Sequence, residues 1–202
     1  MSKYVRINLK KMEKEKERIK MCKRAVEYIR NTKEISAQEA AEKLFEEYNI
    51  ELPVPIIKIV KDAGFSVYVQ DLPTNIGGYI LINSELEKKF NTDKIIVVNE
   101  KENNKRRRFT VAHEFGHYLF SFKQGTQFTN AFENDDTKNT PDEVLVNNFA
   151  AEFLMPKEVF RKKYDELKQN EISDYDILLT LSEIFLTPLK AIERRIQEVI
   201  II

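Results

Sequence analysis

Two histidines, His113 and His117, lie four residues apart with Glu114 directly after the first, in the pattern H-E-x-x-H. They are the only histidines in the chain. On a helix, residues four apart lie on the same face, so both imidazoles reach one metal ion. Glu114 lies about 100 degrees around the helix from His113, where its carboxylate approaches metal-held water without ligating the metal. The spacing predicts a zinc site with Glu114 as the general base.

Two histidines leave a tetrahedral zinc ion short of a third protein ligand. The single cysteine, Cys22, is remote in the sequence, so the third ligand is expected to be a carboxylate. Glu143 and Glu152 both follow on one predicted helix. They are nine residues and about 180 degrees apart, so they cannot both face the metal. The residues alone leave the choice between these two carboxylates open.

The composition favours a folded protein and disfavours several classes of partner. Lys and Arg number 33, as do Asp and Glu, so no excess of positive charge supports non-specific binding to nucleic acid. A hydrophobic content of 42%, with thirteen Phe and eight Tyr, indicates an ordered core. The apolar runs are far shorter than the roughly 18 to 20 residues that cross a bilayer. One cysteine allows no intrachain disulfide, and a cytoplasmic location is expected.

Charge and periodicity divide the chain into three expected parts. Residues 1–35 form a charged helical extension, with a thin apolar stripe along a helix predicted over 8–31. Residues 36–156 form the domain that carries the motif, and it begins where Ser36 and Glu39 have the spacing of a capping box. Residues 157–202 form a helical region that packs on this domain or extends it.

The periodicity predicts an α+β fold. Apolar alternation after residue 64 and two further β-rich runs predict a small antiparallel sheet of three strands: Phe65–Val69, Tyr79–Ile82 and Lys94–Asn99. Helical spacing predicts helices over 106–121, 142–154, 157–168, 173–184 and 188–200. The polar stretch Lys123–Thr140 is interpreted as a long loop that is either a lid or binding element, or disordered.

Two further features of the motif remain open in the sequence. Gly116 inside the helix predicts a close approach, by the sheet or by a substrate. H-E-x-x-H on a helix is typical of metalloproteases, and such enzymes add a donor for the oxyanion that forms when water attacks the scissile carbonyl. Tyr79, Arg107, Tyr118 and Asn147 are candidates by residue type.

Two stretches together resemble the ImmA/IrrE family of zinc metallopeptidases, which carry the HExxH motif of gluzincin-like enzymes. Arg108–His117 reads R-F-T-V-A-H-E-F-G-H, and Glu143–Pro156 reads E-V-L-V-N-N-F-A-A-E-F-L-M-P. The resemblance covers Ala37–Pro156 and weakens through the helical tail. Val146 stands where the family usually has Ala, a departure that removes no candidate ligand.

The resemblance implies a role for each matching residue. The imidazole ligands fall on His113 and His117, the general base on Glu114, and the carboxylate ligand on Glu143, which therefore outranks Glu152. The implied cofactor is Zn²⁺. The implied activity is cleavage of a helix-turn-helix transcriptional repressor that controls a mobile genetic element or a stress response.

Two rival functions are kept beside the peptidase. The first is a zinc-stabilised binding module that captures a repressor or a toxin–antitoxin partner without cutting it. An intact Glu114 speaks against this reading, because ligation needs only the other three residues. The second is direct binding of DNA through the basic run Lys105–Arg108, which is disfavoured because such runs more often neutralise a neighbouring acidic surface.

Overall fold

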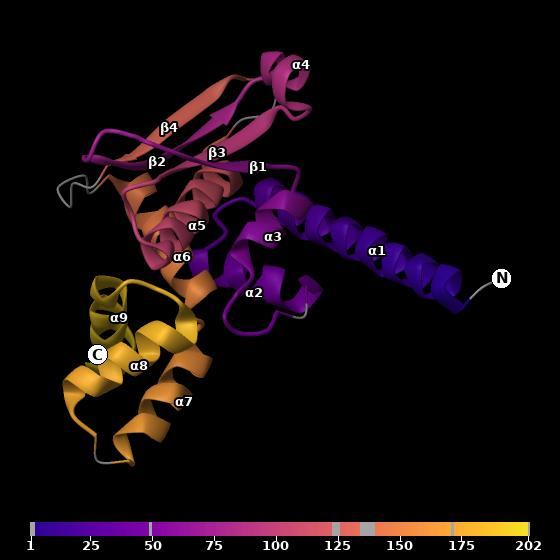
Figure 1. Cartoon of the computed structure of the whole chain (residues 1–202). Helices are drawn as coiled ribbons and strands as arrows, with labels where there is room; N and C mark the ends of the chain where they lie inside the picture. The colour runs from indigo at the N-terminus through magenta and orange to yellow at the C-terminus, as the bar shows by residue number, and fades with distance from the viewer. Residues whose placement is uncertain (1–2, 49, 123–125, 134–139, 171, 202) are drawn as a thin grey trace.

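The computed structural model describes residues 3–48, 50–122, 126–133, 140–170 and 172–201 (Figure 1). Its architecture is α+β, as predicted. The strands are β1 Ser66–Gln70, β2 Ile76–Ile82, β3 Lys94–Asn99 and β4 Phe128–Glu133. The helices are α1 Lys3–Asn31, α2 Ala37–Tyr48, α3 Ile56–Asp62, the turn η1 Ser84–Leu86, α4 Glu87–Phe90, α5 Asn104–Phe120, α6 Pro141–Leu154, α7 Lys157–Lys168, α8 Asp174–Phe185, α9 Leu189–Ile196 and the π-helical turn η2 Gln197–Ile201.

The sheet differs from the predicted one in strand direction. Its order is β1-β3-β2-β4, with β1 parallel to β3 and β2 antiparallel to both β3 and β4. The prediction of a purely antiparallel sheet is therefore wrong. The chain leaves β1, crosses to form β2 and then returns through α4 to place β3 between them, so β1 and β3 run the same way (Figure 1).

The sheet also has a fourth strand, which corrects the prediction of three. β4 lies within the polar stretch Lys123–Thr140 that was interpreted as a loop, and it pairs with β2 from Phe128 opposite Ile82. A strand on the edge of a sheet needs apolar side chains on one face only, so Phe128 and Phe132 suffice among polar neighbours. The rest of that stretch, 123–125 and 134–139, lies outside the described residues.

Helix α5 lies directly against the sheet, which Figure 1 shows as a layer with α5, α6 and α3 on one side. Gly78 of β2 makes this approach possible. A Cβ atom at this position would lie 2.5 Å from the carbonyl oxygen of Val97 and 2.6 Å from Cγ2 of Thr110. Any larger residue would push α5 off the sheet. The sheet thus fixes the position of the helix that carries both histidines.

Helix α6 packs against the other side of α5 at Gly116. A Cβ atom there would lie 3.1 Å from Cβ of Val146 and 3.2 Å from Cδ1 of Phe149. The close neighbour of Gly116 is therefore α6, and not the sheet or a substrate as predicted. This contact brings Glu143, in the first turn of α6, toward the histidines on α5.

Side-chain caps fix where the main helices begin. The predicted capping box before α2 is confirmed: the Ser36 amide donates to a Glu39 carboxylate oxygen at 2.9 Å, and the Glu39 amide donates to Ser36 Oγ at 3.1 Å. Asn103 accepts from the Arg106 amide at the start of α5. Thr140 accepts from the Glu143 amide at 3.3 Å and so sets the first turn of α6.

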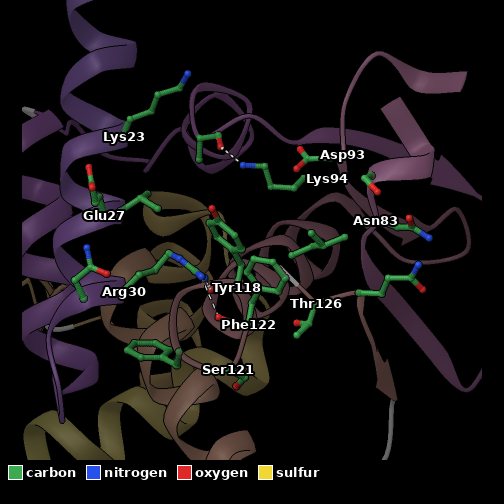
Figure 2. A pocket seen from close by; sticks show the side chains of 17 residues that line it. Lys23, Glu27, Arg30, Asn83, Asp93, Lys94, Tyr118, Ser121, Phe122 and Thr126 are labelled. Atoms are coloured by element: carbon green, nitrogen blue, oxygen red, sulfur yellow. Dashed lines mark hydrogen bonds between the residues drawn. The ribbon is translucent and has the colours of Figure 1, made fainter. Parts of the chain in front are cut away.

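The charged N-terminal helix α1 docks on the body through its predicted apolar stripe, which is buried at Cys22, Ala25 and Ile29. Arg18 donates to Asp62 at 2.7 Å. Arg30 donates to the carbonyl oxygens of Tyr118 and Phe122 and lies over both aromatic rings (Figure 2).

Helices α7, α8 and α9 group together at the C-terminal end (Figure 1). Arg195 of α9 fastens them to the end of α6, because it donates to the carbonyl oxygen of Met155 at 3.0 Å and pairs with Glu152.

The division of the chain into parts at residues 35 and 156 stays a prediction. Among the described residues, no helix combines the length and apolarity that crossing a membrane requires.

Candidate metal centre

Three predicted side chains converge between α5 and α6. His113 Nε2 and His117 Nε2 lie 3.0 Å apart, and each lies 3.3 Å from an oxygen of Glu143. Donor atoms of all three residues lie within 4.8 Å of one another. Zinc bonds of about 2.0 to 2.2 Å in a tetrahedral arrangement separate two ligand atoms by roughly 3.3 to 3.6 Å. The spacing of these donors is therefore close to that around a small divalent cation.

Asn147 orients the first histidine. His113 Nδ1 lies 3.0 Å from Oδ1 of Asn147, one turn beyond Glu143 on α6, and donates a hydrogen bond to it. In a neutral imidazole this leaves a lone pair on Nε2, which faces His117 and Glu143. An outer hydrogen bond of this kind is the usual device that fixes the tautomer of a metal-binding histidine. The donor set fits a metal ion.

Glu114 is fully buried beside this cluster. Among the described residues, neither carboxylate oxygen has a hydrogen-bond partner in bonding geometry. Burial, and then the charge of Glu143, raise the pKa of Glu114 well above its usual range. The backbone N–H of Phe132 approaches the carboxylate and lowers this pKa in part, although it does not reach hydrogen-bonding geometry. A buried, charged carboxyl without a partner lowers the stability of the fold unless the carboxyl is protonated or a cation lies next to it.

His117 is held in its neutral form. Burial, and then the neighbouring His113, lower the pKa of His117 to about 4, although Glu143 acts in the opposite direction. A neutral imidazole is the form that binds metal. The site therefore presents a ready lone pair throughout the neutral pH range.

Strand β4 forms one wall of the site. The sequence did not predict that Phe128 and Phe132 would lie there. The ring of Phe132 lies 4.2 Å from the ring of His113, and the ring of Phe128 lies 6.5 Å from that of His117. The available signal was the spacing of the two Phe residues by four, which places them on one face of a strand. These rings lower the local polarity and so strengthen electrostatic interactions at the cluster.

Glu152, the other carboxylate considered, lies away from the cluster. It pairs with Arg195, and it accepts from the Lys157 amide at 3.0 Å. Cys22 lies on the buried face of α1, and burial raises the pKa of its thiol to about 12, which suits a structural residue. Neither side chain takes part in the group of His113, His117 and Glu143.

Three of the four candidate oxyanion donors are engaged elsewhere in the structure. The hydroxyl of Tyr79 donates to Gln70 at 3.3 Å, and Arg107 Nε donates to a backbone carbonyl at 2.7 Å. Tyr118 lies under the guanidinium of Arg30. Asn147 is at the site, but its amide oxygen is bonded to His113.

The basic run at the start of α5 serves internal contacts. Lys105 donates to Ser182 and Glu183 of α8, each at 2.7 Å. Arg108 is buried and donates to the carbonyl oxygens of Val54 and Leu186. The bonds to Ser182, Glu183 and Leu186 tie α5 to the C-terminal helices, so Lys105 and Arg108 serve contacts within the protein.

A large pocket of about 1010 Å³ lies between α1 and the sheet (Figure 2). Arg30, Lys94 and Tyr118 line it, but neither histidine nor Glu143 does. Its size alone would make it the default binding site. The convergent donors, the buried unpartnered carboxyl and the lowered pKa of His117 all lie at the histidine cluster instead, and this cluster is the stronger candidate for chemistry.

An α+β fold with H-E-x-x-H on one helix and a carboxylate on the next has the arrangement of a metallopeptidase. The sequence matches the IrrE N-terminal-like domain of the peptidase M78 family over residues 61–197, more than half of the chain. The chain belongs to this family, which confirms the resemblance drawn from its motifs. No curated protein matches the sequence.

A solved structure has a similar fold. A Mycobacterium tuberculosis transcriptional regulator superimposes with a TM-score of 0.50 at 17% identity, over 88% of this chain. The chain spans only 51% of that protein's length. At this level of identity the likeness concerns the fold.

Proposed function

We propose that this chain is a zinc-dependent endopeptidase that cleaves a helix-turn-helix transcriptional repressor. The observation that carries the proposal is the juxtaposition of His113, His117 and Glu143 with the buried, unpartnered carboxyl of Glu114. Membership of a peptidase family supports the reaction class. The repressor as substrate comes from the resemblance to ImmA/IrrE proteins, and its link to a mobile element or a stress response has the same source.

In this proposal His113, His117 and Glu143 hold the ion, and Asn147 keeps His113 in the tautomer that binds it. A zinc ion at this position supplies a Lewis acid that polarises the scissile carbonyl and lowers the pKa of water. Glu143 gains from its place in the first turn of α6, because the positive end of the helix dipole favours a carboxylate.

Glu114 moves the proton. Its carboxylate takes a proton from the attacking water and then gives it to the amine of the leaving peptide. Burial brings the pKa of Glu114 up from that of an ordinary carboxyl, so the group is a stronger base than a solvated Glu. Phe128 and Phe132 of β4 limit the access of bulk water on one side.

The same features argue against the capture module as the main function. Holding a metal requires His113, His117 and Glu143 only. A fully buried carboxyl without a hydrogen-bond partner destabilises the fold and contributes nothing to a purely structural site. Proton transfer gives the buried carboxyl of Glu114 a role next to the cluster.

The test is incubation of the zinc-loaded chain with repressors encoded beside its gene, with the products identified by mass. Wild type should yield two fragments. Glu114→Gln should keep its zinc and lose cleavage by about 100-fold or more. Glu166→Gln, an exposed change on α7, is the control and should cleave normally. If Glu114→Gln derepresses the target as fully as wild type while the repressor stays intact, capture replaces cleavage as the function.

A further inference from the structure

Helix α5, which carries both histidines, is closed at its C-terminal end by a side chain of α1. The last four carbonyl groups of an α-helix have no N–H donor within the helix. In α5 the carbonyl of His117 accepts from the amides of Ser121 and Phe122, at 2.9 and 3.1 Å. The Phe122 amide is thus turned toward His117, and the carbonyl of Tyr118 accepts from the guanidinium of Arg30 instead. The last turn of α5, which contains His117, is completed by another helix.

Arg30 holds Phe122 as well as Tyr118 (Figure 2). Its guanidinium donates to the carbonyl of Phe122 at 3.0 Å, and it lies 4.4 Å from the centre of the Tyr118 ring and 4.8 Å from that of Phe122. The two rings stack with their centres 5.6 Å apart. A guanidinium is planar and carries its donors in a fork, so it bonds two carbonyls and lies against aromatic rings at once. A Lys side chain does not reproduce this set of contacts.

The charge of Arg30 serves the end of this helix and not an ion pair. Its hydrogen bonds go to two main-chain carbonyls, and no carboxylate of the described residues lies within ion-pair distance. Burial lowers the pKa of Arg30, although Tyr118 acts in the opposite direction. A cation that is partly removed from water at the C-terminal end of a helix is stabilised by the negative end of the helix dipole.

From Phe122 the contacts continue to the metal centre. The ring of Phe122 lies 6.1 Å from the ring of Phe128, edge to face, and the ring of Phe128 faces that of His117. His117 is therefore supported on two sides, by the last turn of α5 and by the first residue of β4. Arg30 bonds to that turn and to Phe122, so both supports depend on it.

We propose that Arg30 is a positioning residue of the metal centre, which fixes His117 through the last turn of α5 and through the contact of Phe122 with Phe128. The role of the centre rests on the proposed function, whereas the positioning itself requires only that the centre binds a metal ion. Arg30 lies outside residues 61–197, which match the peptidase family. The charged N-terminal helix is then a working part of the site.

Arg18 provides a matched control on the same helix. It donates to both carboxylate oxygens of Asp62, at 2.7 and 3.1 Å, and so also docks α1 on the body through its guanidinium. It lies about three helical turns before Arg30. Its bonds reach Asp62 and Glu15, and neither α5 nor β4. A change at Arg18 weakens the docking of α1 without touching the end of α5.

The experiment compares Arg30→Met with Arg18→Met in the full chain. Met keeps an unbranched side chain but has no N–H donor and no charge. Zinc dissociation constants are measured by competition with a chromophoric chelator. Exchange of the Ser121 and Phe122 amides is followed by NMR in the metal-free proteins, because amides at a helix end exchange by local opening.

Arg30→Met should weaken zinc binding by about tenfold, the scale of losing an outer contact that orients a ligand. It should also accelerate exchange of both amides by about tenfold. Arg18→Met should match wild type in both measurements, because it shares no partner with the centre. An equal loss of zinc affinity in the two variants, or no loss in Arg30→Met, overturns the inference.

Both measurements are independent of cleavage, so a failure of the proposed peptidase activity does not affect them. If wild type binds no zinc, the proposed function fails and amide exchange alone decides: faster exchange only in Arg30→Met supports the fixing of the last turn, and equal exchange overturns it. If Arg30→Met does not fold, Arg30→Lys and Arg18→Lys replace the pair. Arg30→Lys keeps the charge without the fork and should weaken zinc binding by about threefold, and equal affinities of the two Lys variants overturn the inference.

Discussion

Replacing Glu114 by Gln is expected to stabilise the metal-free chain at neutral pH, although it abolishes the proposed activity. The folded state raises the pKa of this carboxyl above its usual 4.5, so the folded chain binds the proton more tightly than the unfolded chain does. The stability that this group contributes is therefore complete below pH 4.5 and is lost as the pH rises. A Gln side chain has no such dependence.

The magnitude follows from the burial. Between pH 4.5 and the raised pKa of the folded carboxyl, wild type loses about 1.4 kcal/mol per pH unit relative to the variant. An unpaired buried polar group costs about 1 to 3 kcal/mol, which sets the scale of the difference at pH 7. The lowered pKa of His117 affects both proteins equally and cancels in the comparison.

The assay is urea unfolding of both proteins in chelator at pH 5.5, 6.5 and 7.5. The difference in the free energy of unfolding should favour Glu114→Gln and should grow with pH. Glu152→Gln is the control with the opposite sign, because it leaves Arg195 buried without its main partner. The reasoning is refuted if Glu114→Gln is less stable than wild type, or if the difference does not change with pH.

Three further outcomes follow from the site. Asn147→Ala removes the bond that orients His113 and should weaken zinc affinity by about 10- to 100-fold in a competition titration, with the fold intact by circular dichroism. Gly116→Ala places a methyl against Val146 and should lower the free energy of unfolding by about 1 to 3 kcal/mol in urea. In the metal-free Glu114→Gln chain, where the opposing slope of Glu114 is absent, the free energy of unfolding should fall by up to about 3 kcal/mol as the pH falls from 6.5 toward 4, because the unfolded chain protonates His117 first. Adding His117→Gln should remove this slope.

Local periodicity was enough to predict the elements that carry the site. The four-residue spacing of His113 and His117 placed both on one helical face, and the capping box at Ser36 marked the start of α2 correctly. The choice of Glu143 over Glu152 came from the family resemblance and not from periodicity, because both carboxylates lie on α6.

Features that depend on contacts between distant segments could not be predicted from the sequence. The pairing of β4 with β2 depends on a partner strand some fifty residues away, and the polar residues around Phe128 and Phe132 concealed the strand. The parallel pairing of β1 with β3 depends on how the chain crosses between strands. The sequence makes Asn147 a candidate oxyanion donor, whereas in the structure it orients His113. A side-chain amide can serve as an oxyanion donor or as a partner of a histidine, and only its position in the fold distinguishes the two roles.

The most direct test of the metal centre is the zinc content of four purified proteins, measured per chain by elemental analysis after loading and dialysis. Wild type and Glu152→Gln are predicted to retain one zinc ion, whereas His113→Ala and Glu143→Gln retain little or none. Equal zinc in wild type and His113→Ala would contradict the assignment of the site. Loss of zinc from Glu152→Gln, with retention by Glu143→Gln, would assign the third ligand to the other carboxylate.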